Sequence, residues 1–360
     1  MANARRKILV TGSSGQIGSE LVVALRERYG TKNVVACDSK PLKEALGIFE
    51  LADATDREVL EDIIRKHRVG SIFHLVSILS AAGEKNPNLA WRVNLESLRN
   101  VLELAVEYKM DQVFWPSSIA AFGPHTPRIH THQLTVMDPN TMYGITKVTG
   151  ELLCNYFFVK YGLDVRCLRY PGIISWKTPP GGGTTDYAVA IFHGALRDGR
   201  YECFVSADTV MPMMYMPDAI RAAMEFMASP RSRIRTHLGY NLAAMSFSAG
   251  DMAQEVKRHL PNFVCTYKPD ERQKIADSWP KSIDDTGSRK DWGWKPQFNL
   301  RKTAEDMLKI CDWLLATEIP PDNGLRRDLT SPARLGRRLY VWLGRSRLQS
   351  ADSTQPYDIL

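Results

Sequence analysis

The feature that most constrains the fold is a glycine-rich turn near the start of the chain. The stretch "VTGSSGQIG" spaces three glycines by three residues each, at Gly12, Gly15 and Gly18. A short apolar strand pattern (7–12) precedes the turn, and a helical pattern (16–30) follows it. Such glycines let the backbone approach a pyrophosphate, which then faces the N-terminus of the helix. The turn therefore predicts a dinucleotide-binding unit.

Strand-like and helix-like segments then alternate through the first half of the chain. Further strand patterns occupy 33–38, 71–77, 112–118 and 164–172, and helical patterns occupy 56–67, 86–110 and the stretch that follows residue 141. This alternation indicates βαβ units and a parallel sheet. We predict an α/β fold: a Rossmann-type doubly wound parallel sheet with a smaller, discontinuous C-terminal lobe that binds the substrate.

Asp38 ends the second strand pattern, and it suits a role in choosing the cofactor. An acid at this place hydrogen-bonds the ribose hydroxyls of NAD and repels the extra phosphate of NADP. Two alternatives stay open, because "DSKP" is also turn-like and Lys40 would suit NADP. Asp53 follows a possible third strand and is expected either to meet the adenine or to cap the next helix.

Tyr143 and Lys147 are four residues apart, which places them on one face of a helix. A neighbouring cation favours phenolate, so this spacing predicts that the pKa of Tyr143 falls below its ordinary value. Such a phenol can act as a general base near neutral pH. An isolated pair of this kind also arises by chance, and it gains meaning here from the cofactor motif.

Composition excludes several other classes of function. The net charge is +7, but seven arginines and one aspartate within 326–347 account for 7 − 1 = +6, which leaves a nearly neutral body and no indication of nucleic-acid binding. The six cysteines are scattered, and three histidines (125, 130 and 132) lack ligand spacing, so we assign no metal. The apolar run at the start is three residues long, and we expect a cytoplasmic protein.

Several blocks together carry a family resemblance. "TGSSGQIG", "YGITK" and "RYPGI" resemble the extended short-chain dehydrogenases/reductases. The blocks "LSAAGEKNPNLAWRVN", "FWPSSIAAFGP", "PGGGTTDYA", "VMPMMYMPDAIRA" and "IADSWPKSIDDTGSRKDWGW" resemble the L-threonine 3-dehydrogenases built on the epimerase-type scaffold. The resemblance runs from about residue 6 to about residue 316. It is not to the zinc-dependent type of threonine dehydrogenase.

The resemblance implies roles for individual residues. Tyr143 would be the catalytic base, Lys147 its partner, and Ser118 the hydroxyl that holds the substrate oxygen, although Ser118 also suits a strand-end turn. The residues expected at NAD are Gly12, Gly15, Gln16, Ile17, Gly18, Asp38, Asp53, Leu75, Tyr143, Lys147, Tyr170 and Pro171. Those expected at the substrate are Ser80, Ser117, Ser118, Tyr143, Gly183, Thr185, Asp186 and Trp279.

The substrate residues have structural alternatives as well. Asp186 could pair with a substrate ammonium, or it could cap the helical pattern that begins at residue 187. Trp279 could close over the amino acid or belong to the core, and Ser80 could contact the carboxylate or be a loop serine.

The implied reaction is NAD-dependent oxidation of the 3-hydroxyl of L-threonine to 2-amino-3-oxobutyrate. A nucleotide-sugar 4-epimerase or dehydratase, a dehydrogenase of another β-hydroxy amino acid, and a non-catalytic NAD sensor are the alternatives. The expected organisation is an NAD-binding domain (1–172) rejoined by part of 207–245, a lobe that mainly binds substrate (173–317) and a basic amphipathic extension (318–360). The resemblance also implies a homodimer through helices near 87–109 and 143–161, and the extension is expected to dock on a subunit, a partner or a membrane surface.

Overall fold

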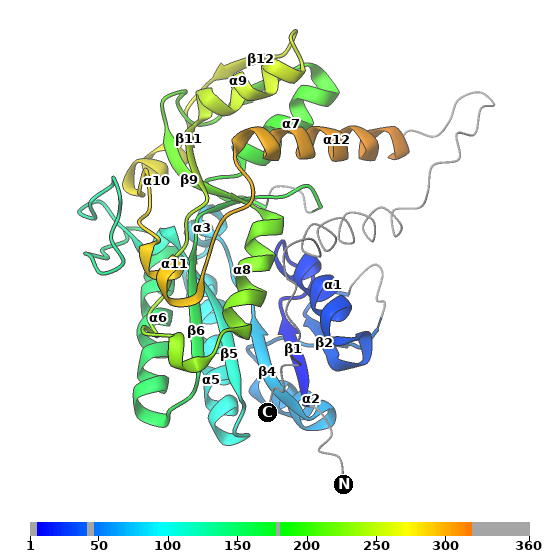
Figure 1. Ribbon diagram of the computed structural model, residues 1–360, viewed down its shortest axis with the longest axis vertical. Coiled ribbons are helices and arrows are strands. Elements are labelled where there is room, and N and C mark those ends of the chain that lie inside the picture. Colours follow the sequence, from blue (N-terminus) through cyan, green and yellow to red (C-terminus); the bar gives the residue numbers. More distant parts are fainter. Residues whose placement is uncertain (1–5, 42–46, 178–180, 319–360) are drawn as a thin grey trace, which may run out of the picture. The chain divides into compact units, whose positions relative to one another are not determined.

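A seven-stranded, all-parallel sheet forms the centre of the larger lobe (Figure 1). The computed structural model describes residues 6–41, 47–177 and 181–318. Its strands are β1 (Lys7–Thr11), β2 (Val34–Asp38), β3 (Phe49–Leu51), β4 (Val69–His74), β5 (Gln112–Ser118), β6 (Val165–Tyr170) and β10 (Tyr240–Asn241), and their order across the sheet is β10-β6-β5-β4-β1-β2-β3. From β1 the chain adds β2 and β3 on one side and then β4, β5, β6 and β10 on the other, so the strand order reverses between β1 and β4. Ligands bind at such switch points. The predicted fold class is confirmed.

Helices cover both faces of this sheet. They are α1 (Gly18–Tyr29), α2 (Arg57–His67), α3 (Ser80–Lys85), α4 (Pro87–Trp91), α5 (Ser97–Glu107), α6 (Met142–Tyr161) and α8 (Met216–Ala228). The apolar sides of α2, α5 and α6 share one core with β1, β2, β4, β5 and β6. Helices α1 and α8 pack against each other, α1 also against β1 and β2, and α8 against β5 and β6. Burial of apolar side chains in these layers is the main force that fixes the sheet.

The smaller lobe begins directly after β6. Its three-stranded sheet has the order β11-β9-β7, with β7 (Gly172–Ile174), β9 (Val210–Tyr215) and β11 (Met245–Ser248), and a second pair joins β8 (Arg200–Cys203) to β12 (Val264–Tyr267). Its helices are α7 (Tyr187–Asp198), α9 (Ala249–His259), α10 (Arg272–Ser278), α11 (Thr286–Trp292) and α12 (Leu300–Glu318). The chain leaves this lobe after β9, and both α8 and β10 belong to the larger lobe. These two elements lie within 207–245, the segment predicted to return.

The predicted helix over 86–110 is interrupted. Helices α4 and α5 are joined by a π-helical turn, Arg92–Glu96. Asn94 in this turn accepts from the backbone N–H of Ile78 at 2.7 Å and donates to Thr146 Oγ1 at 3.0 Å. The turn thus aims one amide at the loop after β4 and at α6, and π-turns are frequent near functional sites. Helical periodicity does not reveal such an inserted residue.

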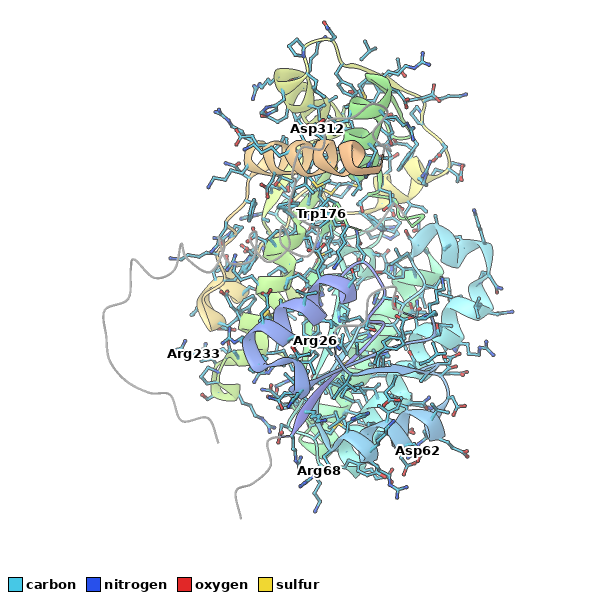
Figure 2. All side chains as sticks on the ribbon, turned by 90° about the vertical axis from the view of Figure 1, so that its right-hand side faces the viewer. Arg26, Asp62, Arg68, Trp176, Arg233 and Asp312 are labelled. Carbon is cyan, nitrogen blue, oxygen red and sulfur yellow. The ribbon has the colours of Figure 1, made fainter. Side chains whose placement is uncertain are left out.

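Exposed charged side chains include Asp62 on α2, Arg68 at the end of α2 and Arg233 after α8 (Figure 2). Residues up to Leu315 form one compact unit. Within the described ranges, no helix is both long and apolar enough to cross a membrane. The basic amphipathic extension falls almost wholly outside the described residues, so its docking stays a prediction.

Candidate active site

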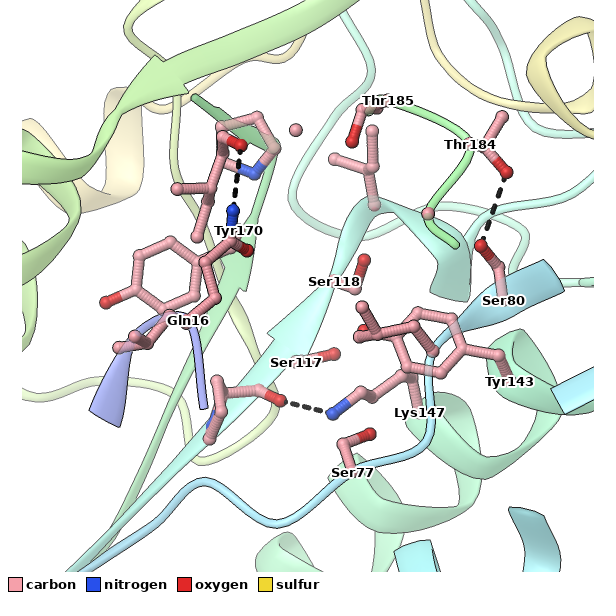
Figure 3. Close-up of a pocket in the computed structure, with 18 of the residues that line it drawn as sticks. Gln16, Ser77, Ser80, Ser117, Ser118, Tyr143, Lys147, Tyr170, Thr184 and Thr185 are labelled. Carbon is pink, nitrogen blue, oxygen red and sulfur yellow. Dashed lines mark hydrogen bonds between the residues drawn. The ribbon is translucent and has the colours of Figure 1, made fainter. Parts of the chain in front are cut away.

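A pocket opens where the carboxyl ends of β4, β5 and β6 meet the smaller lobe (Figure 3). The empty space between its lining residues, including the part open to solvent, is about 780 Å³. Fourteen of the predicted residues line it: Gln16, Ile17, Leu75, Ser80, Ser117, Ser118, Tyr143, Lys147, Tyr170, Pro171, Gly183, Thr185, Asp186 and Trp279. Residues that are more than one hundred positions apart in the sequence therefore share one cavity.

The glycine-rich turn has a geometry that only glycine fits. Gly12 has a positive φ of 73°, and a Cβ on Gly18 would lie 2.2 Å from the carbonyl oxygen of Gly12. The turn delivers the chain into α1, whose N-terminus begins at Gly18. A tight turn with glycine at its closest backbone approaches, placed at a helix N-terminus, fits the pyrophosphate of a dinucleotide. Gln16 links the turn to the smaller lobe, because its Nε2 donates to Ser175 Oγ at 2.9 Å.

Asp38 lies beside the glycine-rich turn, outside the pocket lining itself. Its carboxylate accepts from the backbone N–H of Ser14 at 2.9 Å and from that of Lys40 at 3.0 Å. Each oxygen keeps further acceptor capacity for a ribose hydroxyl. Asp53 instead closes a local turn, since its Oδ1 accepts from the N–H and the hydroxyl of Thr55, and the helix cap of α2 is Asp56.

Replacing Asp38 with Ala is expected to raise the KM for NAD about tenfold and to weaken the preference for NAD over NADP. The carboxylate that accepts from the ribose is lost, and so is the charge that repels a 2′-phosphate. Initial rates with each cofactor measure both effects. An unchanged preference between NAD and NADP would remove Asp38 from cofactor selection.

Helix α6 brings Tyr143 and Lys147 together. Thr141 starts the helix by accepting from the N–H of Gly144 at 3.1 Å, and both side chains point from one face of α6 into the pocket (Figure 3). The Lys147 Nζ lies 5.3 Å from the centre of the Tyr143 ring and 4.5 Å from that of Trp115. It donates to the carbonyl oxygen of Pro116 at 2.7 Å.

The prediction that Lys147 lowers the pKa of Tyr143 is wrong in this structure. Burial raises the pKa of Tyr143 to about 12, and a hydrogen bond with Ser118 opposes that rise only partly. Burial also lowers the pKa of Lys147 to about 7. The sequence argument treated both groups as hydrated, whereas here each charged form loses its water and Lys147 turns its ammonium to Pro116. The proton that leaves the pair most easily is therefore on Lys147.

The two adjacent serines at the end of β5 serve different partners. Ser118 lines the pocket beside Tyr143, and its Oγ accepts from the N–H of Ala120 at 3.1 Å, so the suggested strand-end turn is present. The hydroxyl of Ser117 donates to Glu151 at 2.5 Å. Ser118 is thus placed to share a substrate oxygen with Tyr143, while Ser117 is engaged with α6.

The opposite wall of the pocket comes from the smaller lobe. Asp186 precedes α7, yet its side chain does not cap that helix; it accepts from the N–H groups of Gly182 at 2.9 Å and Gly183 at 2.8 Å. Burial raises the pKa of Asp186, and these glycine N–H groups act against the rise. Trp279 lines the pocket and also belongs to the core, with 4% of its surface exposed.

Sequence reasoning missed seven lining residues: Ser77, Leu79, Pro116, Ile119, Gly172, Ile173 and Thr184. Thr184 matters most, because its hydroxyl lies 3.2 Å from that of Ser80 and hydrogen-bonds to it (Figure 3). The chain offers Thr184 and Thr185 in succession, and only the folded turn shows which one faces Ser80. Among the residues that the structure describes, no group of three His, Cys, Asp or Glu side chains is arranged to hold a metal.

Comparison with known proteins gives the family. The model of the NAD dependent epimerase/dehydratase family matches residues 8–243. The chain belongs to this family. An uncharacterized epimerase/dehydratase of Staphylococcus haemolyticus is 47% identical over 311 residues, which cover 85% of this chain and 98% of that protein. Family membership supports NAD as the cofactor, in agreement with the glycine-rich turn.

Solved structures refine the placement within the NAD dependent epimerase/dehydratase family. The holo form of a GalE-like L-threonine dehydrogenase from Cupriavidus necator is 50% identical, with a TM-score of 0.83, over 84% of this chain and 99% of that one. A monomeric L-threonine 3-dehydrogenase from a metagenome is also 50% identical, with a TM-score of 0.83, over 85% and 99%. The resemblance drawn from the sequence is thereby confirmed.

Proposed function

We propose that this chain is an oxidoreductase that uses NAD to oxidise the 3-hydroxyl of L-threonine to 2-amino-3-oxobutyrate. The observation that carries the proposal is the content of one pocket: Tyr143, Lys147 and Ser118 share it with the carboxylate of Asp186. The relatives that share half of their residues with this chain bear the name L-threonine dehydrogenase. The alternative is a nucleotide-sugar epimerase or dehydratase, the activity after which the family is named.

Recognition of an amino acid requires partners for both of its charges. The carboxylate of Asp186 suits the substrate ammonium, and two glycine N–H groups already fix its position. The hydroxyls of Ser80 and Thr184 can donate to the substrate carboxylate. Trp279 completes the wall and limits the size of the substrate side chain.

NAD, when bound, supplies the acceptor for the hydride that leaves the hydroxyl-bearing carbon. The glycine-rich turn would hold its pyrophosphate, and Asp38 its ribose. Ser118 orients the substrate hydroxyl toward Tyr143. In the pair that has lost one proton, the phenol oxygen of Tyr143 takes the substrate proton while the phenol's own proton passes to the neutral amine of Lys147. Tyr143 and Lys147 titrate as one coupled pair. The catalytically active form is the pair from which one proton has been removed.

The pH dependence follows from this pair. Because burial lowers the pKa of Lys147 to about 7, the pair loses its first proton as the pH rises through that value. We expect kcat/KM to be low at acidic pH and to rise about tenfold per pH unit until an apparent pKa near 7. Rates in buffers of constant ionic strength measure this. A flat profile through that range would show that the pair does not set the rate.

The activity itself is tested by incubating the full chain with NAD and each of a panel of substrates. Appearance of the NADH absorbance band with L-threonine, and weaker or no signal with L-serine and other β-hydroxy amino acids, supports the proposal. Conversion of a nucleotide sugar without net NADH, together with no response to L-threonine, would favour the epimerase alternative.

The predicted homodimer is a further proposal. Helix α6 exposes Leu152, Tyr156 and Val159 on one face, with 55%, 52% and 73% of their surfaces accessible. An apolar stripe of this kind suits a helix-packed interface. The metagenomic relative carries the description monomeric, so the state of this chain needs its own measurement.

Replacing Val159 with Lys is expected to convert a dimer into a monomer, because each partner would bury a charge against the stripe. Light scattering coupled to size-exclusion chromatography reads the mass. Val59→Lys on α2, which also replaces an exposed valine, is the matched control and should stay dimeric. A wild-type chain that is already monomeric would contradict the proposed homodimer.

The cytoplasmic location and the docking of the extension stay predictions.

A further inference from the structure

A buried charge pair lies behind the active site, and the mechanism above does not use it. Glu151 on α6 and Arg169 on β6 have 0% and 1% of their side-chain surfaces exposed. Arg169 Nε donates to Glu151 Oε1 at 2.8 Å, and its Nη2 donates to Oε2 at 2.7 Å. A buried ion pair adds little net stability compared with apolar packing. A gain in stability therefore does not explain why this pair lies next to the active site.

The carboxylate of Glu151 is fully committed to donors. Besides Arg169, it accepts from the hydroxyl of Ser117 at 2.5 Å and from the N–H of Gly239 at 3.0 Å. A Cβ on Gly239 would lie 2.5 Å from Glu151 Oε1, so the backbone there approaches as closely as glycine permits. Four charge-assisted hydrogen bonds leave Glu151 a single position.

Glu151 and Lys147 hold the same end of β5 from one helix. Lys147 Nζ bonds to the carbonyl oxygen of Pro116, and Glu151 bonds to the hydroxyl of the next residue, Ser117. The residue after that is Ser118, which lines the pocket together with Tyr143. The distance between Tyr143 on α6 and Ser118 on β5 therefore depends on two contacts between this helix and this strand. Glu151 makes one of these contacts, and Lys147 makes the other.

Arg169, the partner of Glu151, also bonds to two segments that are distant in the sequence. Its Nη1 donates to the carbonyl oxygen of Gln133 at 2.9 Å and to Asn241 Oδ1 at 3.0 Å. Gln133 belongs to the long loop before α6, and Asn241 to β10. The pair thus joins both helix α6 and strand β5 to the edge of the sheet.

The charge of Glu151 also bears on Lys147, one helical turn away. The titratable groups around Lys147 are Tyr143, Glu151 and Cys154 on α6, His74 on β4 and Cys167 on β6. Burial lowers the pKa of Lys147, whereas Cys167, Cys154 and Glu151 act against that decrease. Thiols are mostly neutral at pH 7, and burial lowers the pKa of His74 to about 3. Glu151 is therefore the anion that remains.

We propose that Glu151, held by Arg169, is a positioning residue of the reaction: it fixes the end of β5 that carries Ser118, and it places a negative charge one helical turn from Lys147. This inference rests on the proposed function of the same pocket. Arg169 contributes by keeping the carboxylate in place and by tying it to the loop before α6.

The test is Glu151→Gln in the full chain, assayed with L-threonine and NAD. The amide keeps the size of the side chain and removes its charge. The acid limb of the kcat/KM profile is expected to move to lower pH by about one unit, because an ammonium without its neighbouring anion loses its proton more easily. We expect kcat to fall about tenfold through the looser strand end, with the Kd for NAD unchanged within about twofold. Glu151→Asp, which restores the charge, should return the limb to its original pH.

Asp164→Asn is the matched control. Asp164 forms another buried pair with Arg166 on β6, at 2.8 Å, with 3% and 0% of the side chains exposed. Its loss is expected to lower the melting temperature while the acid limb stays in place. A limb that stays unchanged in folded Glu151→Gln, or one that moves equally in Asp164→Asn, would overturn the proposal.

Ser117→Ala decides the matter should Glu151→Gln not fold. It removes only the hydroxyl between Glu151 and β5, so kcat is expected to fall about tenfold at an unchanged acid limb and an unchanged Kd for NAD. Wild-type turnover in Ser117→Ala would overturn the positioning role. The proposed function fails separately, since it predicts NADH formation from L-threonine by the unmodified chain.

Discussion

Replacing Tyr143 with Phe is expected to lower kcat about 10³-fold, while the Kd for NAD changes by less than about twofold. The substitution removes the phenol oxygen that takes the substrate proton. It keeps the ring, which is buried in the core beside Lys147. Steady-state rates of NADH formation give kcat, and fluorescence titration gives the Kd. The fold should persist, because Phe fills the same space without an unpaired hydroxyl.

Tyr170→Phe is the matched control for this loss. Tyr170 is also a buried tyrosine that lines the pocket, but its hydroxyl donates to the carbonyl oxygen of Ala219 at 2.9 Å, away from the Ser118 side. Its kcat is expected to stay within about threefold of the wild type, at the cost of one hydrogen bond in stability, about 1 kcal/mol. Wild-type turnover in Tyr143→Phe would mean that another group accepts the proton.

Replacing Gly18 with Ala is expected to raise the Kd for NAD at least about 100-fold. The new Cβ would lie 2.2 Å from the carbonyl oxygen of Gly12 and 2.8 Å from Ser13 Cα, and both are backbone atoms that cannot yield without moving the turn. Opening the turn displaces the N–H groups at the start of α1 that face the pyrophosphate. Calorimetry with NAD measures the loss.

Gly287→Ala provides the control for this substitution. Gly287 is also near the start of a helix, α11, but a Cβ there would meet its nearest neighbour, Tyr240, at an ordinary 3.7 Å. The Kd for NAD should stay at the wild-type value. Equal Kd values in Gly18→Ala and Gly287→Ala would mean that the glycine-rich turn does not hold the cofactor.

Much of the larger lobe was predictable because its signals are local. Apolar strands that alternate with helical periodicity indicate a parallel sheet, and Gly12 and Gly18 mark the tight turn directly. Tyr143 and Lys147 share a helix, so their common face follows from their spacing alone. The catalytic role of Ser118 was predicted from the family resemblance alone, since nothing in the local sequence distinguishes one strand-end serine from another.

The remaining features depend on contacts between distant segments. The pKa of Tyr143 rises because both it and Lys147 are buried, and because Lys147 Nζ finds the carbonyl oxygen of Pro116. The partners of Glu151 lie 18, 34 and 88 residues away in the chain. No periodicity or motif encodes such distances. Likewise, the π-turn before α5 carries Asn94, which bonds to Thr146 on α6, 52 residues further along the chain.

The most direct measurement follows the hydrogen on the carbon that bears the hydroxyl. L-threonine labelled with deuterium at C3 should yield NADH that carries one deuterium, as mass spectrometry would show. The Tyr143→Phe variant should form NADH far more slowly. NADH without the label would place the oxidation at another carbon, and absence of NADH from an otherwise folded, NAD-binding chain would contradict the proposed reaction.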